Sequence, residues 1–347
     1  MKKNRAFTLI ELLVVIAIIA LLIGILLPAI GKAKRTANEL KDATQTRSIV
    51  QAMNVFAVSN GDNYPLPSRL DRNDKTLSGT GLNNPIQKDK TRHIVSILLF
   101  QGLIQTEIAL SPVELGLYEQ YSDYEADRPD AAVGTNDTEK AQALWDPGFR
   151  ATPMDGLVTN GVEGAPAGQP GANGSGGFSY AHMTPFLLRR NNWSFTTSAV
   201  IPVISTRGAA YELDGNGQSG SWQLINSATA QANGKTPLGI NSVTLGMFGS
   251  RSDWTGNVAF ADEHTEKPNR PDPQTVIWQF SGLTNEGKAQ ADNLFVNESD
   301  TLRTPTTPLT EKVNLTTSSN RNAFMWQYYN VEVATNGSNL QISPYYD

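Results

Sequence analysis

One carboxylate, that of Glu11, lies inside a run of residues with the composition of a membrane span. From Leu12 to Ile30 every side chain is apolar, glycine or proline. Together with residues 7 to 11, this run is long enough, at about 1.5 Å per helical residue, to cross a hydrocarbon layer of about 30 Å. A charged side chain inside a bilayer costs roughly 2.5 to 3.5 kcal/mol, so such residues are usually functional and paired. The chemistry that we expect of Glu11 is therefore pairing with a cation.

A cation for Glu11 arises if the chain is cut between Ala6 and Phe7. The new α-amino group of Phe7 would lie one helical turn from Glu11, on its own chain or on a neighbouring one. Residues 2 to 5, Lys-Lys-Asn-Arg, form a short basic head before this junction, and the small residue Ala6 stands directly at it.

This arrangement resembles the prepilin signal of type IV pilins and type II secretion pseudopilins. The resemblance implies that a membrane-bound prepilin peptidase removes residues 1–6 on the cytoplasmic face and methylates Phe7. It places the family's assembly glutamate on Glu11 and the family's helix-kinking proline on Pro28. The family usually has glycine before the cut, where this chain has Ala6.

Two simpler interpretations of the N-terminus fit less well. The removable apolar region of a secretory signal peptide has about 7 to 15 residues and needs no acid. A plain N-terminal anchor would leave Glu11 unexplained. Basic residues flank the span on both sides, at 2–5 and 32–35, so positive charge does not set its orientation. The family resemblance implies a cytoplasmic N-terminus and an inner-membrane precursor.

The predicted span has one weak point, between Gly24 and Pro28. Pro28 has no N–H to donate to the carbonyl of Gly24, and its ring crowds that carbonyl. In lipid the freed carbonyl must find another partner. A simple bend and local melting both stay open, and the resemblance to filament-forming pilins favours melting on assembly.

Beyond Pro28 the pattern changes to that of an amphipathic helix. Apolar residues recur there at three- and four-residue spacing, with charged residues, Asp42 and Arg47 among them, on the remaining faces. The expected buried stripe comprises Ile30, Ala33, Ala37, Leu40, Ile49, Val50, Met53, Phe56 and Ala57. Gly61 and two following prolines end the helix. A helix of about fifty residues far exceeds the globular mean of about 11 to 12, and the resemblance identifies it as a pilin stalk.

We therefore expect an α+β, pilin-like fold, in which the long N-terminal helix packs on a β-sheet-rich head with long loops. The segments are a leader (1–6), a transmembrane or filament-core helix (7–30), an amphipathic stalk helix (31–59) and a globular head (60–347). Strands are predicted at 199–205, 240–247, 257–261, 275–280 and 325–333. Helices are predicted at 93–104 and 112–118, and loops at 161–177 and 297–320.

Residues 256–266 predict a β-hairpin with Val258 and Phe260 facing inward. The segment resembles the C-terminal hairpin of a class of bacterial prepilin-like proteins named for a histidine followed nine residues later by Asp-Gly. Here Ser252 replaces the histidine. Glu263 replaces the glycine, the residue that most readily adopts positive φ.

Catalytic chemistry finds little support, and we expect no enzyme. The chain has 0 cysteines and 3 histidines, and His93, His182 and His264 match no catalytic or zinc spacing. A core or surface role is expected for each. Residues 214–217, Asp-Gly-Asn-Gly, carry oxygen ligands that could touch Ca²⁺, but a distal glutamate is missing and a plain turn is favoured. No cofactor is expected.

Net charge of −5 over 347 residues argues against a nucleic-acid surface. The expected function is that of a structural subunit of a pilus-like or pseudopilus filament. Its expected partners are the prepilin peptidase, other pilin subunits and the inner-membrane assembly platform. The alternative, from a different class, is a minor pilin or membrane-anchored module whose head binds or adheres at the cell surface. The assembled protein is expected in the periplasm or outside the cell.

Overall fold

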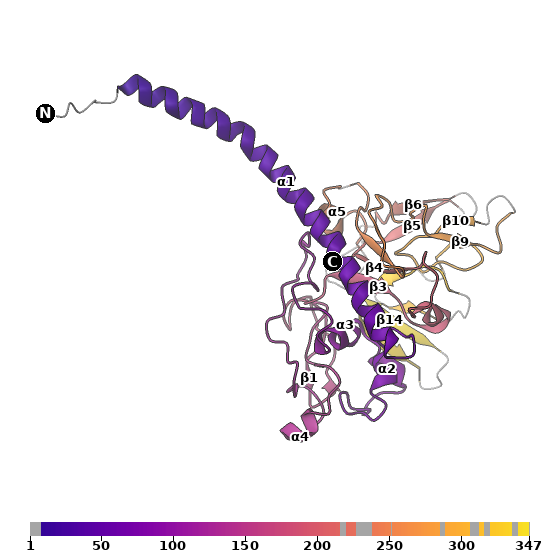
Figure 1. Cartoon of the computed structure of the whole chain (residues 1–347). Coiled ribbons are helices and arrows are strands. Elements are labelled where there is room, and N and C mark those ends of the chain that lie inside the picture. The colour runs from indigo at the N-terminus through magenta and orange to yellow at the C-terminus, as the bar shows by residue number, and fades with distance from the viewer. Residues whose placement is uncertain are drawn as a thin grey trace. The chain divides into compact units, whose positions relative to one another are not determined.

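The computed structural model divides the chain into two compact units, Met1–Lys41 and Asp42–Asp347 (Figure 1). It describes residues 8–215, 220–226, 238–250, 252–284, 289–305, 312–315, 320–334 and 339–346. Ala6 and Phe7, where cleavage is predicted, lie outside the described residues, and so do Asn216 and Gly217 of the predicted calcium-touching turn. The predicted segment boundaries after residues 30 and 59 stay predictions.

The first element is a single helix, α1 (Leu9–Val58), of 50 residues with Pro28 inside it. It ends where the sequence predicts. Gly61 has φ +61° and Asp62 has φ +62°. The N–H groups of Asn60 and Asp62 both donate to the carbonyl of Ala57, at 2.9 and 3.0 Å. Left-handed residues just after the last turn thus satisfy carbonyls that the helix leaves open.

The other helices are short. They are α2 (Pro67–Leu70), η1 (Pro85–Lys88), α3 (Thr91–Phe100), α4 (Asp137–Lys140), η2 (Leu187–Asn192) and α5 (Thr244–Met247). α3 confirms the helix predicted from residue 93.

The strands form antiparallel sheets in the second unit. The largest has five strands in the order β12-β3-β4-β7-β8, with β12 (Met325–Trp326), β3 (Tyr180–Met183), β4 (Pro202–Thr206), β7 (Val258–Phe260) and β8 (Thr265–Glu266). A three-stranded sheet has the order β11 (Val313–Asn314), β14 (Leu340–Pro344) and β13 (Tyr328–Val333). The two-stranded pairs are β1 (Val158–Thr159) with β2 (Val162–Glu163), β5 (Tyr211–Asp214) with β6 (Ser221–Leu224), and β9 (Ile277–Gln279) with β10 (Ala289–Ala291).

This layout, a long N-terminal helix followed by a head rich in antiparallel strands, confirms the predicted α+β, pilin-like class. The strands predicted at 199–205, 257–261, 275–280 and 325–333 are present, with shifted ends, as β4, β7, β9 and the pair β12 and β13. Both predicted loop segments also contain a short strand, β2 in 161–177 and β11 in 297–320.

Two predicted elements are wrong. Residues 240–247 are a turn followed by α5 rather than a strand, because Ser242 Oγ accepts the N–H of Thr244 at 3.3 Å and starts a helical turn. Residues 112–118 form no helix. The carboxylate of Glu114 instead accepts the N–H groups of Leu115 and Gly116, at 3.0 and 2.7 Å, and pairs with Arg207.

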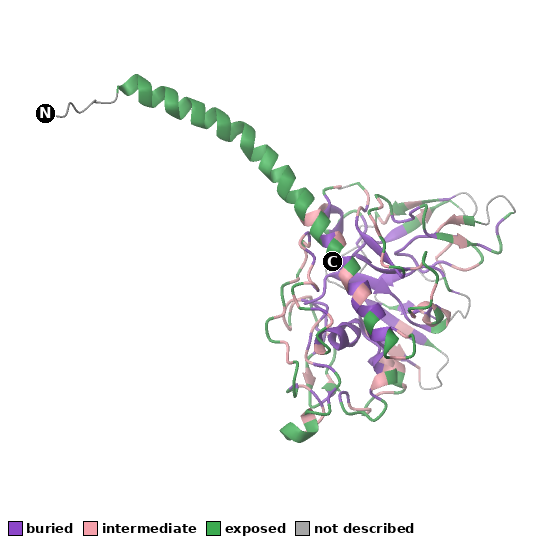
Figure 2. Cartoon of the chain, in the orientation of Figure 1, coloured by how far each residue is buried: buried purple, intermediate pink, exposed green. Residues whose placement is uncertain are grey.

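The part of α1 inside the second unit buries the predicted stripe only from Ile49 onward. The predicted burial of the earlier stripe residues is wrong, because no other part of the described chain covers them; these are Ile30, Ala33, Ala37 and Leu40. Ile49, Val50, Met53 and Phe56 expose between 0 and 2 % of their surface. Figure 2 shows the resulting change along α1, from exposed over its first part to buried on one side where it enters the head.

Asp42, which was expected on a charged face of the helix, is instead fully buried. Its carboxylate accepts hydrogen bonds from Ser111 Oγ, from Asn257 Nδ2 at 2.7 Å and from Thr206 Oγ1 at 3.3 Å. Burial raises the pKa of Asp42. These donors offset much of the cost of removing a carboxylate from water.

The predicted hairpin is β7 and β8, and Val258 and Phe260 are both buried, as expected. Glu263, in the turn, has φ +70°. Its carboxylate accepts hydrogen bonds from α1, from Asn54 Nδ2 at 2.9 Å and Gln51 Nε2 at 3.1 Å. A left-handed residue with a Cβ costs roughly 1–2 kcal/mol, whereas hydrogen bonds to a charged group contribute about 1.5–3 kcal/mol each. The contact with α1 therefore outweighs the backbone cost.

His93 and His182 are core residues. His93 Nε2 lies 3.0 Å from Glu163 Oε1, and its Nδ1 accepts the indole N–H of Trp145 at 3.1 Å. His182 lies between Thr91 Oγ1 and the carbonyl of Met183, both at 2.9 Å. Burial lowers the pKa of each histidine to about 4. Both are therefore neutral at physiological pH.

The Glu263 contact predicts an unequal response to two small substitutions. Glu263→Ala should lower the free energy of unfolding by about 2 kcal/mol, because it removes the bonds to α1 and keeps the left-handed strain. Glu263→Gly should lower it by about 1 kcal/mol less, because glycine relieves that strain. Denaturant unfolding of the detergent-solubilised chain measures both, and equal loss in the two variants would show that the strain is negligible.

The buried histidines predict a pH dependence. The folded-state pKa of His93 lies below the unfolded value of about 6.5, so the unfolded chain binds more protons, and stability is lost as pH falls from about 6.5 towards 4. The facing charges are Glu163, Lys90 and Arg92. His93→Gln, which can keep both hydrogen bonds, should lose less stability than wild type between pH 7.5 and 4.5, by on the order of 2–3 kcal/mol. A difference in the free energy of unfolding between His93→Gln and wild type that stays the same at every pH would contradict this.

Candidate functional site

The first turn of α1 holds Thr8 and Glu11 in a reciprocal pair. Glu11 Oε2 accepts the backbone N–H of Thr8 and also its hydroxyl, each at 2.8 Å. The backbone N–H of Glu11 points back to Thr8 Oγ1 at 3.2 Å, and the N–H of Leu12 donates to the Thr8 carbonyl at 3.2 Å. Thr8 is thus the N-cap and Glu11 the third helical residue of a capping box.

This geometry gives Glu11 a role within its own chain that the sequence analysis missed. A helix start leaves backbone N–H groups without partners, and water is scarce where they enter lipid. The box satisfies two of them, and the negative carboxylate also complements the positive end of the helix dipole. The signal was present in the sequence, as Thr-x-x-Glu directly before an apolar run.

The pair with Thr8 uses only one of the two oxygens of the Glu11 carboxylate, and the other oxygen can accept a further bond. Both bonds from Thr8 reach Oε2, and within the described part of the chain no hydrogen bond reaches Oε1 of Glu11. An ionised carboxylate offers about four acceptor sites on its two oxygens. Glu11 can therefore cap the helix and accept a cation at the same time.

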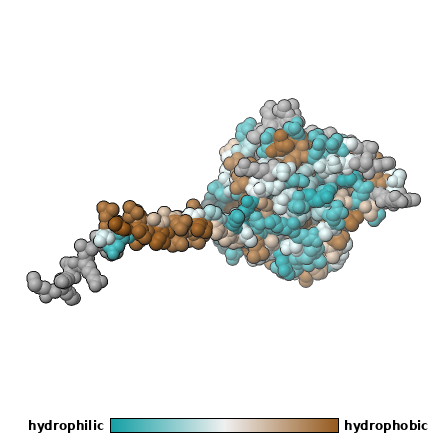
Figure 3. Space-filling model, turned by 90° about the horizontal axis from the view of Figure 1, so that it is seen from above, coloured by the Kyte–Doolittle hydropathy of each residue, from teal (hydrophilic) through white to brown (hydrophobic). Residues whose placement is uncertain are grey.

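The surface around this site is apolar on all sides. Every residue from 8 to 37 is exposed within the chain, and Leu9, Ile10 and Leu27 expose 70 % or more of their surface. Figure 3 shows a long hydrophobic stretch along this part of α1, with hydrophilic residues at its N-terminal end. α1 is also the one helix in the described residues that is long and apolar enough to cross a membrane. Lipid or other protein chains must cover this surface in the cell.

Gly24 and Pro28 lie further along the same helix and do not meet Glu11. α1 runs through both positions without a break. A Cβ added to Gly24 would find no atom within 4 Å, so no packing inside the chain requires a glycine there. The freed carbonyl at Gly24 and the exposed glycine are features for contacts with lipid or with other chains.

Outside this site, the described residues bring together few side chains suited to catalysis or metal binding. Of the histidines, His264 is the exposed one, 41 % at its side chain, and it stacks on Phe260 with ring centroids 4.2 Å apart. Among the described residues, no group of three or more His, Asp or Glu side chains is placed to hold a metal ion. Asp214 ends β5, and Gly215 follows with φ +100°.

Comparison with known proteins gives one match. The family profile of the prokaryotic N-terminal methylation motif matches residues 1–27, a range that includes Ala6, Phe7, Glu11 and Gly24. Neither the search of curated proteins nor that of solved structures returned a match. The motif implies processing by a prepilin peptidase and assembly with other pilins, and the apolar helix fits a membrane-anchored precursor. Together with the long N-terminal helix and the antiparallel head, this match supports a type IV pilin-like protein that is made as a pilin or pseudopilin-type precursor.

Proposed function

We propose that the chain is a structural subunit of a type IV pilus-like or type II secretion pseudopilus filament. The observation that carries the proposal is the Thr8 and Glu11 pair, which lies within a matched methylation motif and starts a helix whose first part is apolar and exposed. The precursor lies in the inner membrane with its N-terminus in the cytoplasm. After assembly the head faces the periplasm or the exterior.

Processing creates the cation that Glu11 accepts. The peptidase cuts between Ala6 and Phe7 and methylates the new amine, which keeps its charge. Because Thr8 is the N-cap, this amine belongs to the residue directly before the cap. We expect it to pair with the open Oε1 of Glu11, in its own chain or in a neighbour.

Assembly exchanges lipid for neighbouring helices around α1. The segment from Gly24 to Pro28 is the place where the helix loses turns as it moves into the filament core, because Pro28 already lacks one helical hydrogen bond. The inner-membrane assembly platform and other pilin subunits are the partners of this step.

We also propose that the protein has no catalytic role and no cofactor. The absence of cysteine and the buried, neutral state of His93 and His182 support this. The open alternative is a minor pilin with a binding head. This alternative is supported by a groove of about 410 Å³ whose lining includes Lys90 and Glu163, which pair at 2.5 Å. Low copy number in sheared filaments would favour that alternative.

Mass spectrometry of the membrane and filament fractions tests the processing. The mature chain should begin at Phe7 with a methyl group on its amine. A chain that keeps residues 1–6 in sheared filaments, or one cut well beyond Ile30, would reject the proposed function.

Two variants of Glu11 separate charge pairing from helix capping. Glu11→Gln keeps the capping box, because glutamine can also serve at the third helical position, but it removes the charge. Glu11→Leu removes both. If Glu11 pairs with an amine, both variants should insert into the membrane and both should lose filaments by tenfold or more. Filaments from Glu11→Gln at wild-type yield would show that capping alone is required, and Thr8→Val is the matched control that disturbs the cap without touching the charge.

A further inference from the structure

Two acids, Asp292 and Glu298, lie inside the second unit and expose 1 % and 0 % of their surface. Asp292 comes directly after β10, and Glu298 follows in the same stretch of chain. Glu298 Oε1 accepts the backbone N–H of Asn293 at 2.8 Å, so its carboxyl group lies against the peptide that joins Asp292 to Asn293. The two side chains therefore belong to one buried site, which we call the acid pair.

One oxygen of each acid has no hydrogen-bond partner among the described residues. Asp292 Oδ2 accepts the N–H of Ala323 at 2.5 Å, whereas its Oδ1 accepts no bond. In Glu298, Oε1 is the bonded oxygen and Oε2 is the one without a donor. A buried carboxylate is costly unless donors or cations satisfy it. A protonated carboxyl group is neutral, and its O–H can itself donate. The open oxygens therefore favour the protonated form.

The nearby arginines do not pair with these acids. Arg189 donates to the carbonyl and the side-chain oxygen of Asn322, at 2.8 and 2.6 Å. Arg303 donates to Gln290 Oε1 at 2.9 Å, and its Nη2 lies 3.7 Å from Asp272. Within the described part of the chain, neither member of the acid pair forms an ion pair.

The surroundings of the acid pair oppose its ionisation. Burial is the largest effect and raises the pKa of both acids, and the negative charge of Asp292 raises the pKa of Glu298 further. The other charges that face the pair are those of Arg189, Arg303, Asp272 and Asp300. Since two of these are negative, the two positive charges do not neutralise a fully ionised pair.

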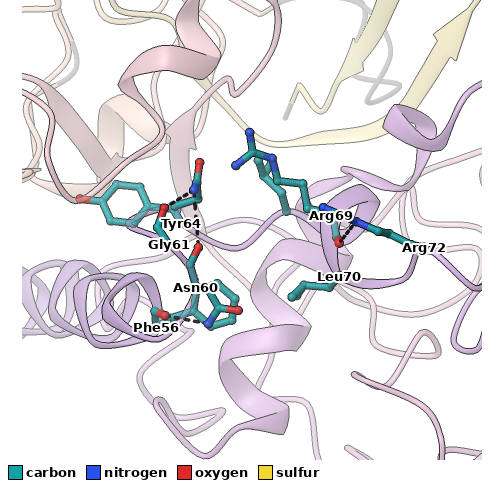
Figure 4. A pocket seen from close by; sticks show the side chains of 9 residues that line it. Phe56, Asn60, Gly61, Tyr64, Arg69, Leu70 and Arg72 are labelled. Carbon is teal, nitrogen blue, oxygen red and sulfur yellow. Dashed lines mark hydrogen bonds between the residues drawn. The ribbon is translucent and has the colours of Figure 1, made fainter.

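Exposed charges without partners have no such consequence. Arg69 and Arg72, labelled in Figure 4, lie at an open hollow beyond the end of α1 and form no ion pair with a described residue. Both are exposed, so water solvates them. The acid pair differs because it is buried, and the missing partners must then be supplied from within the site.

We propose that Asp292 and Glu298 form a buried proton-binding pair, which holds at least one proton in the folded head near neutral pH and loses it under alkaline conditions. The bound proton removes one of two buried negative charges. Its loss destabilises the contacts that the pair makes with the next segment of the core, where Asn322 Nδ2 donates to the Glu298 carbonyl at 2.9 Å. The inference concerns the folded head and does not rest on the proposed function.

The pair makes stability depend on pH in the opposite direction to the buried histidines. Folding raises the pKa of both acids, so the folded chain binds more protons than the unfolded chain, in which Asp and Glu titrate at about 3.9 and 4.3. This stability is fully present below those unfolded values and is lost as the pH rises through the raised folded-state values. A comparison of variants separates it from the effect of His93 and His182.

Denaturant unfolding of the detergent-solubilised full-length chain tests the pair. The double variant Asp292→Asn with Glu298→Gln keeps an oxygen for each backbone N–H but cannot titrate. Between about pH 5.5 and 8.5, the unfolding equilibrium constant of wild type should rise about tenfold or more relative to that of this variant, because one bound proton changes it by up to about tenfold per pH unit. Asp127→Asn, at a side chain that is 79 % exposed, should behave like wild type.

Infrared spectra of the folded chain give a second readout, because a protonated carboxyl group absorbs apart from a carboxylate. At pH 7.5 the protonated-carboxyl band of wild type should be stronger than that of Asp292→Asn or of Glu298→Gln, and Asp127→Asn should leave it unchanged. This measurement needs only one folded single variant. Equal bands in wild type and both single variants, or a ratio of unfolding constants that does not change with pH, would overturn the inference. Stability that rises with pH and with added Ca²⁺ in wild type but not in the double variant would assign the pair to a metal ion and overturn it as well.

Discussion

Helix α1 has two different surroundings along its length, and the packing of the second unit begins where they change. Up to residue 37 the side chains of α1 are exposed and, over the span, apolar on every side. From Asp42 onward one face is buried. The carboxylate of Asp42 marks this change. It is tolerated inside the protein only because donors from three separate segments converge on it.

Carboxylates that accept hydrogen bonds from backbone or side-chain N–H groups stabilise many loops of the head. Asp71 accepts the N–H groups of residues 75, 76 and 77, at 2.6, 3.2 and 2.9 Å. Glu114 does the same for residues 115 and 116, and Glu263 joins a turn to α1. Charge-assisted hydrogen bonds of this kind are among the stronger ones in proteins. In a head without disulfides, they fix loops that short strands alone would leave open.

Local pattern was sufficient to predict the elements that depend on near neighbours. The period of apolar residues, with Gly61 and the following prolines, predicted the end of α1, and the alternation around Val258 and Phe260 predicted the β7–β8 hairpin. The Thr-x-x-Glu spacing of Thr8 and Glu11 is an equally clear local pattern, but a carboxylate in an apolar run also predicts a cation partner, and that prediction left no role for the bond within the chain.

Long-range contacts account for what the sequence could not predict. The donors to Asp42 lie 69, 164 and 215 residues away, so nothing near Asp42 distinguishes it from a solvent-facing acid.

Charge balance at the N-terminus decides whether a core made of apolar helices can form at all. The carboxylate of Glu11 divides its two oxygens, because Oε2 is used by Thr8 while Oε1 stays open. In the proposed filament, the methylated amine would keep its positive charge, so its pair with Glu11 would be neutral whether the amine belongs to the same chain or to a neighbour. The remaining basic side chains, Lys32, Lys34 and Arg35, come after the apolar run. A core of such helices would therefore bury no uncompensated charge, and the cost of removing Glu11 from water is met once by the cap and once by the amine.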